Sequence, residues 1–129
     1  MSWPIHFPES CPPDAATSVA GITLYRTTKT DPASAADFLS GFEIFGARFN
    51  SAKLCIDCGL SVFAEASHIQ DMALRVPALR SKHVAALSLS DADGVTLPTP
   101  TKNSDHHSTW WTSSRPEELA GKCIMVGKT

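Results

Sequence analysis

Two adjacent tryptophans near the C-terminal end of the chain restrict its fold more than any other feature. Trp110 and Trp111 follow two adjacent histidines in the stretch SDHHSTWWTSS. These residues predict a strand over 106–112, and successive side chains of a strand point to opposite faces of the sheet. Trp110 therefore shares one face with His106, and Trp111 shares the other face with His107. Since an indole is costly to leave in water, we expect one tryptophan in the core and its neighbour under an N-terminal arm or a ligand.

The size and charge of the chain set outer limits on its fold and partners. Its 129 residues match one domain that is large enough to bury a core. Apolar residues at 43% and charged residues at 19% are near globular averages, which argues against wholesale disorder. A net charge of -2 gives no reason to expect nucleic acid or an anionic membrane as a partner. The apolar runs are also too short to span a bilayer.

The segment 1–20 has the composition of an extended arm. It contains four of the nine prolines, and Trp3, Ile5 and Phe7 alternate along it, so one side of the arm is apolar. Such an arm has to lie against its own domain or, if it is exchanged, against a second subunit, which would make a homodimer. The remaining residues, 21–129, are expected to form a single domain.

The start of the chain also bears on the cellular compartment. It has no basic segment, and its prolines interrupt any apolar run, so it does not resemble a secretory signal. A cytoplasmic location is therefore expected. In that compartment Cys11, Cys55, Cys58 and Cys123 are expected to be reduced thiols, an expectation that export would reverse.

Cys55 and Cys58 form a C-x2-C pair, which leaves zinc binding open as an alternative. His106 and His107, or the two other cysteines, could complete four ligands, but no second pair has the characteristic spacing. A redox pair would be expected at the start of a helix, whereas a strand is predicted directly after Cys58, which argues against redox catalysis. We therefore predict structural thiols and no metal site.

Strand patterns and helix patterns alternate along the rest of the chain. The expected strands contain β-branched, aromatic or alternating apolar residues and are bounded by glycine or turn residues. They lie at 21–26, 59–64, 83–90, 106–112 and 121–126, with a short strand at 53–56. The DADG turn after 83–90 predicts a hairpin into extended residues at 95–97, and RPEEL at 115–119 is expected to be a short turn.

Two helices are expected between these strands. Asp31, followed by proline, starts the first helix, which ends at Gly41. Ser67 and Gln70 have the spacing of a capping box and start the second helix, which ends before Pro77. Together the elements predict an α+β fold: a single domain with a mostly antiparallel sheet of about five or six strands and two helices packed mainly on one face.

The strand at 106–112 is the predicted binding surface. One of its faces, made by His106 and Trp110 or by His107 and Trp111, could stack an aromatic ligand and donate a hydrogen bond to it. The alternative is simple core packing of the two tryptophans. No carboxylates are spaced so that they must share a catalytic face, so enzymatic activity is left open. The sequence thus favours a small binding or interaction module whose partner is a protein or a small molecule, with no cofactor.

Several segments resemble, in order and over nearly the whole length, a family of short uncharacterised bacterial proteins. They are CPPDAA, GITLYRTT, DPASAADFLS, CGLSVFAEA, RVPALR and DHHSTWW. This resemblance implies a bacterial or phage origin and a single domain. An accessory role at a bacterial toxin or defence locus is a separate expectation for the binding module. It implies no activity.

LYR, GARFN and GLSVFAEASHIQDMA resemble successive segments of the ADP-ribosyltransferase-like RES domain of bacterial toxins. The resemblance implies that Arg26 and Arg48 bind NAD, and an arginine that emerges from a sheet often meets an anion. Two positions depart from the family pattern: Phe63 stands where a tyrosine is expected, and only Asp71 offers a carboxylate near the place of the catalytic glutamate. The alternative function is therefore an ADP-ribosyltransferase-like, RES-type NAD-binding protein or enzyme, and the two departures favour an NAD-binding relative over a working transferase.

Overall fold

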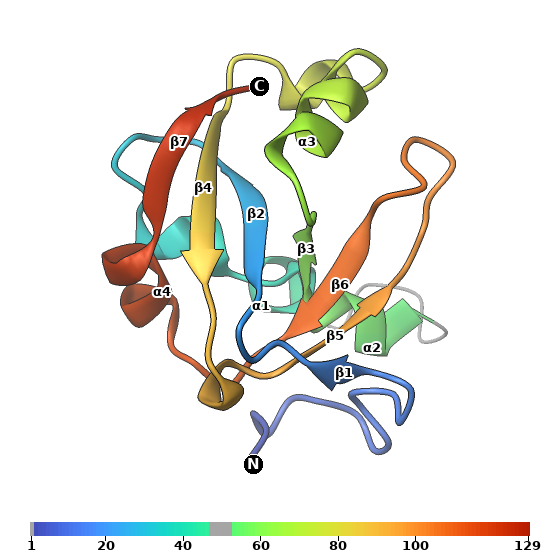
Figure 1. The fold of residues 1–129 in the computed structure, drawn as a ribbon. Helices are drawn as coiled ribbons and strands as arrows, with labels where there is room; N and C mark the ends of the chain where they lie inside the picture. The colour runs from blue at the N-terminus through green and yellow to red at the C-terminus, as the bar shows by residue number, and fades with distance from the viewer. Residues whose placement is uncertain (1, 47–52) are drawn as a thin grey trace.

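The computed structural model describes residues 2–46 and 53–129 and shows an α+β domain with two antiparallel sheets (Figure 1). The α+β class predicted from the sequence is confirmed. The elements follow in chain order: β1 (Thr17–Ser18), β2 (Thr23–Thr28), η1 (Ala35–Phe38), α1 (Gly41–Phe45), α2 (Leu54–Asp57), β3 (Leu60–Val62), α3 (Ala66–Ala73), η4 (Pro77–Leu79), β4 (His83–Ser88), η5 (Asp91–Asp93), β5 (Val95–Pro98), β6 (Ser108–Trp111), α4 (Pro116–Lys122) and β7 (Ile124–Lys128), where η marks a 3-10 helix.

The first sheet has four strands in the order β1-β5-β6-β3 and contains both tryptophans. Strand β6 lies in its middle, where Leu60 of β3 is opposite Trp110 and Val95 of β5 is opposite Trp111. Opposite residues of an antiparallel pair lie on the same face of a sheet. Trp110 therefore lies on the face of Leu60, and Trp111 lies on the other face, so the predicted alternation of the two indoles is confirmed.

The second sheet has three strands in the order β2-β4-β7, and its strands β2 and β4 pack against other elements on both faces. Leu24 and Leu87, which pair across β2 and β4, pack with Phe38 of η1 and Leu119 of α4. The opposite face packs under α3, where Ile69 contacts the core cluster that also contains Phe63 and Val84 of β4. Burial of these apolar faces is the main stabilising force of the domain.

The predicted helix from Asp31 to Gly41 is wrong, because local caps divide this segment. Ser34 precedes the 3-10 helix η1, and the Asp37 carboxylate accepts from the backbone N–H of Ser34. A second cap follows at once: the Ser40 hydroxyl accepts from the Glu43 N–H and starts α1. Serine and aspartate side chains that bind nearby backbone groups favour such caps over a continuous helix.

The second predicted helix is confirmed as α3, although it begins at Ala66 rather than at the predicted cap Ser67. Ile69 and Ala73 are buried, as expected from their helical spacing. The short strand predicted at 53–56 is wrong, since this segment forms the helix α2. The predicted turn at 115–119 is the start of α4, which has Pro116 at its first position and two glutamates in its first turn.

The hairpin predicted at the DADG turn is also wrong. Strand β4 pairs with β2 and β7, whereas β5 pairs with β1 and β6, so the turn carries the chain from one sheet to the other. The Asp93 carboxylate accepts from the Ser90 N–H and stabilises η5 in place of a two-residue hairpin turn. Gly94 follows with a φ of 112°, a conformation that favours glycine.

The N-terminal arm lies against its own domain and is attached to it covalently. Cys11 of the arm forms a disulfide with Cys55 of α2, with a distance of 5.6 Å between the Cα atoms. The prediction of reduced thiols is therefore wrong for these two residues, while Cys58 and Cys123 are free. The arm also stacks its His6 ring on Phe42 at 4.9 Å between ring centroids. A homodimer through the arm stays a prediction.

Candidate functional site

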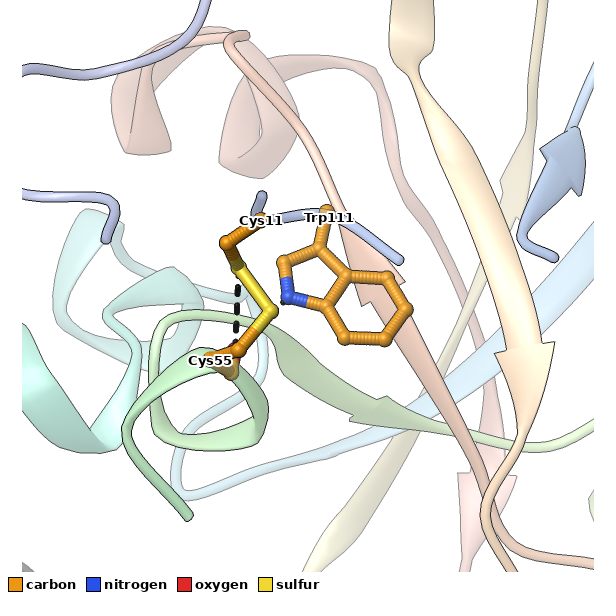
Figure 2. The surroundings of a disulfide bond; sticks show 3 residues. All are labelled: Cys11, Cys55 and Trp111. Carbon is orange, nitrogen blue, oxygen red and sulfur yellow. Dashed lines mark hydrogen bonds between the residues drawn. A yellow bond between two sulfur atoms is a disulfide. The ribbon is translucent and has the colours of Figure 1, made fainter. Parts of the chain in front are cut away.

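Both tryptophans of the predicted binding surface are fully buried. Trp110 lies in the main core, and its Nε1–H donates to the Asp93 carbonyl at 2.7 Å. Trp111 lies beside the Cys11–Cys55 disulfide, as Figure 2 shows, and its Nε1–H donates to the Cys55 carbonyl at 2.7 Å. Helix α2 and the arm thus cover the second indole. Of the two covers expected from the sequence, the N-terminal arm or a ligand, the arm is the one present, and the disulfide attaches it covalently to α2.

The other end of the Trp111 face is open and carries His107. Its Nε2 lies 2.9 Å from the Ser61 hydroxyl, and its Nδ1 lies 2.9 Å from the Thr99 carbonyl oxygen and 3.0 Å from the Thr99 hydroxyl. The imidazole also meets the Phe63 ring edge to face, with 5.6 Å between centroids. Contacts on three sides therefore fix the orientation of His107.

The Thr99 carbonyl determines which nitrogen of His107 carries the proton. A carbonyl oxygen only accepts hydrogen bonds, so Nδ1 must be the protonated nitrogen of the neutral ring. Nε2 then has a free lone pair and accepts from the Ser61 hydroxyl. Ser61 is exposed between buried Leu60 and Val62, so its hydroxyl is accessible from solvent.

Burial and charge both keep the imidazole neutral. Burial lowers the pKa of His107 below its usual 6.5; the hydrogen bond to Thr99 opposes this shift and the positive charge of Arg26 adds to it. Burial also lowers the pKa of Arg26 to about 10, against the effect of Asp37. Arg26 therefore remains protonated at neutral pH, while His107 is a neutral acceptor.

The two sheets meet beside this pair and then separate. Tyr25 of β2 and Phe63 exchange backbone hydrogen bonds of 2.8 and 2.9 Å in an isolated bridge. Further along, the Ser61 carbonyl accepts from Arg26 Nη1 at 2.9 Å, and Arg26 Nε donates to the Asp37 carbonyl at 2.9 Å. The guanidinium thus ties η1 to β3. In Figure 1, β2 and β3 lie side by side and lead away from each other toward α3.

Two hollows adjoin His107, and the smaller of them lies at this divergence, where Thr27 of β2 and Ser61 of β3 both line it. One has a volume of about 250 Å³ and is lined by Ser61, Phe63, Met72 and Leu79 among others. The second has a volume of about 490 Å³ and includes the cationic side chains of Lys53 and Lys102 in its lining. His107 lines both hollows, whose walls are mainly apolar, and the larger one also includes the positively charged Lys53 and Lys102.

The other predicted site residues that the structure describes line neither hollow. His106 stacks on His68 of α3 at 3.8 Å between ring centroids, away from both hollows of His107. Arg48 lies outside the described residues. Arg26 contacts the site, but its hydrogen bonds go to main-chain carbonyls and hold the fold together.

The zinc alternative finds no ligand set in residues 2–46 and 53–129. In these ranges no group of three or more His, Cys, Asp or Glu side chains is placed to hold a metal ion. Cys55 is engaged in the disulfide, and burial, followed by the charges of Asp57 and Glu43, raises the pKa of Cys58 to about 11. A thiol with so high a pKa is mostly protonated, which makes it a poor ligand and a poor nucleophile at neutral pH.

Comparison with protein-family models, with curated proteins and with solved structures finds no significant match to this chain. In the described part of the chain, no helix has the length and apolar character that crossing a membrane requires. The resemblances to the bacterial family and to the RES domain stay predictions.

Sequence reasoning missed Ser61 and Thr99, which complete the site around His107. Ser61 is 46 residues from His107 in the chain, and no short motif joins them. One signal was present: a single polar residue alternates with buried apolar residues in the strand GLSVF. This pattern indicated that Ser61 is exposed, but the sequence did not indicate its contact with His107.

Proposed function

We propose that this protein is a small-molecule binding module and that its ligand occupies the two hollows at His107. The observation that carries the proposal is the placement of this imidazole, which is fixed by Thr99 and Ser61 and lines two mainly apolar hollows, the larger of which also includes two lysines. Binding sites typically combine apolar walls with a few fixed polar groups. The ligand expected here is a small anion with an aromatic or aliphatic part.

The sizes of the hollows limit the ligand. The apolar hollow of about 250 Å³ lies just below the roughly 300 Å³ at which sites for drug-sized ligands begin. A single ring or a short acyl chain fits this volume. The carboxylate or phosphate of the ligand would face Lys53 and Lys102, whose charges attract anions.

Thermal unfolding in the presence of benzoate, phenyl phosphate and NAD tests the proposal. We expect benzoate or phenyl phosphate to raise the unfolding temperature of the wild type and to have no effect on His107→Ala, because a ligand stabilises the state that binds it. His106→Ala is the matched control, since its ring lies outside both hollows. Shifts that persist in His107→Ala, or flat curves with all three probes, would contradict the proposal.

NAD is included because the RES resemblance implies it as the ligand. Stabilisation by NAD that disappears in Arg26→Ala would favour the ADP-ribosyltransferase-like alternative. The guanidinium of Arg26 is already engaged with two main-chain carbonyls, so we favour the smaller anions. An accessory role at a toxin or defence locus stays a prediction.

The disulfide bears on where the protein works. Disulfides persist in oxidising compartments and are rare in the cytoplasm. The Cys11–Cys55 bond therefore favours an oxidising compartment over the cytoplasmic location that the sequence predicts. Trapping of free thiols in whole cells before lysis checks this: two modified cysteines per chain support an oxidising compartment, and four support the cytoplasm.

A further inference from the structure

We propose that Ser61 and His107 form a nucleophile and general base pair that hydrolyses small esters bound in the hollows at His107. This inference rests on the proposed binding function and adds a reaction to it. Its basis is the distance of 2.9 Å between Ser61 Oγ and His107 Nε2 and the hydrogen bond from Nδ1 to Thr99 that makes Nε2 the acceptor.

The arrangement has the parts that an activated serine needs. A nucleophilic hydroxyl requires a base within hydrogen-bond reach, and the base requires a third group that fixes its tautomer and orientation. His107 is the base, and the Thr99 carbonyl is the orienting group. Because the His107 pKa lies below 6.5, the imidazole can accept a proton at neutral pH.

Strand β2 supplies a candidate donor for the oxyanion. Residues two apart in a strand direct their N–H groups to the same side. The Tyr25 N–H donates to Phe63 of the neighbouring segment, so the Thr27 N–H is directed to the same side, where β2 and β3 separate. Thr27 lines the apolar hollow together with Ser61. A backbone N–H in this position can stabilise the negative charge that develops on a substrate carbonyl.

The proposed reaction balances with an ester and water alone. Ser61 Oγ bonds to the carbonyl carbon, the carbonyl π electrons move to its oxygen, and the hydroxyl proton passes to His107 Nε2. When the carbonyl re-forms, the bond from carbon to the leaving oxygen breaks, and the proton on Nε2 passes to that oxygen. Water then attacks the acyl group with His107 as base, which releases a carboxylic acid and restores Ser61.

The hollows select the class of ester. The acyl group is expected in the hollow of about 250 Å³ beside Phe63, which limits it to a short chain or a single ring. An anionic group on the alcohol would face Lys53 and Lys102 in the neighbouring hollow. The expected substrates are therefore small esters of short-chain or aromatic acids, preferably with an anionic alcohol part.

Hydrolysis of 4-nitrophenyl acetate, followed by absorbance, tests the reaction. We expect Ser61→Ala and His107→Ala each to lower kcat/KM by roughly 100-fold or more, and Ser108→Ala to leave it unchanged. Ser108 is the matched control because it lies on the same strand pair as Ser61, opposite Val62 and on the other face. The acid limb of the wild-type pH profile should have its midpoint below 6.5, since the pKa of His107 is lowered.

Covalent labelling identifies the nucleophile independently of turnover. Phenylmethylsulfonyl fluoride should label the peptide that contains Ser61 in the wild type and fail to label it in His107→Ala. Hydrolysis that persists in Ser61→Ala, or a label on another residue, would overturn the proposal. A protein that binds benzoate or phenyl phosphate but hydrolyses no ester would also overturn the proposed hydrolysis and leave the proposed binding function standing. A protein that neither binds these ligands nor hydrolyses esters would contradict both proposals.

Discussion

Removal of the Cys11–Cys55 disulfide should strongly destabilise this domain. The two cysteines are 44 residues apart in the chain, so the bond closes a long loop in the unfolded state. The loop-entropy relation gives roughly 13 cal/mol/K for such a loop, or about 4 kcal/mol at room temperature. A domain of this size has a stability of roughly 5–15 kcal/mol, so the expected loss is a large part of the total.

Urea denaturation of the double variant Cys11→Ser/Cys55→Ser measures this loss. The double variant is preferable to either single one, because it leaves no thiol of the pair free to react with Cys58. With a denaturant slope of about 2 kcal/mol/M, a loss of about 4 kcal/mol moves the unfolding midpoint down by roughly 2 M. Cys123→Ser is the control, since Cys123 is a free thiol.

Reduction of the wild type must reproduce the effect of the double variant and must not change the double variant itself. A second readout is tryptophan fluorescence, because the disulfide lies beside the buried Trp111 (Figure 2). A midpoint that moves by less than about 0.5 M would refute the loop-entropy argument. Four free thiols in protein purified without reductant would refute the disulfide itself.

Two further predictions concern the turn that joins the sheets. Gly94→Ala should lower the free energy of unfolding by about 1–3 kcal/mol or more, because φ is positive there and a Cβ would overlap the Trp111 backbone. Gly121→Ala is the control, since a Cβ at this helical position meets open space. It should stabilise the protein by up to about 1 kcal/mol in the same urea titration. Burial alone would raise the pKa of Asp93, but its hydrogen bonds, the one from Lys122 first, lower it below 3.8 in the folded state. The stability that Asp93 contributes should therefore be lost as the pH falls from 3.8, the unfolded-state pKa, through the lower folded-state pKa. Asp93→Asn should make the unfolding temperature less dependent on pH in this acid range, which an acid titration of the unfolding temperature measures.

Much of the local structure could be predicted from the sequence. The helix α3 and the strands β2, β3, β4 and β6 follow from apolar spacing, because side chains repeat along a helix and alternate along a strand by geometry. The alternation of Trp110 and Trp111 held for the same reason. The first predicted helix failed because side-chain caps compete with a continuous helix, and the caps at Ser34 and Ser40 divide this segment.

The candidate site could be predicted only in part. His107 was among the predicted residues, but its partners come from β3 and from the segment before β6, and the contact with Ser61 spans 46 residues. For the second indole the sequence left two covers open, the arm and a ligand, because a sequence pattern does not show which distant segment packs on a given face of a strand. In this chain the arm and α2 cover Trp111, and their disulfide fixes them there.

By itself, the sequence determined the period of each element, and therefore which side chains share a face, because these properties depend on neighbours within a few residues. Only the tertiary structure decided that the strands form two sheets, that the arm and α2 cover Trp111, and that Ser61 contacts His107 beside the point where the sheets separate. Those outcomes depend on contacts between segments far apart in the chain, and many pairings of such segments bury similar apolar area.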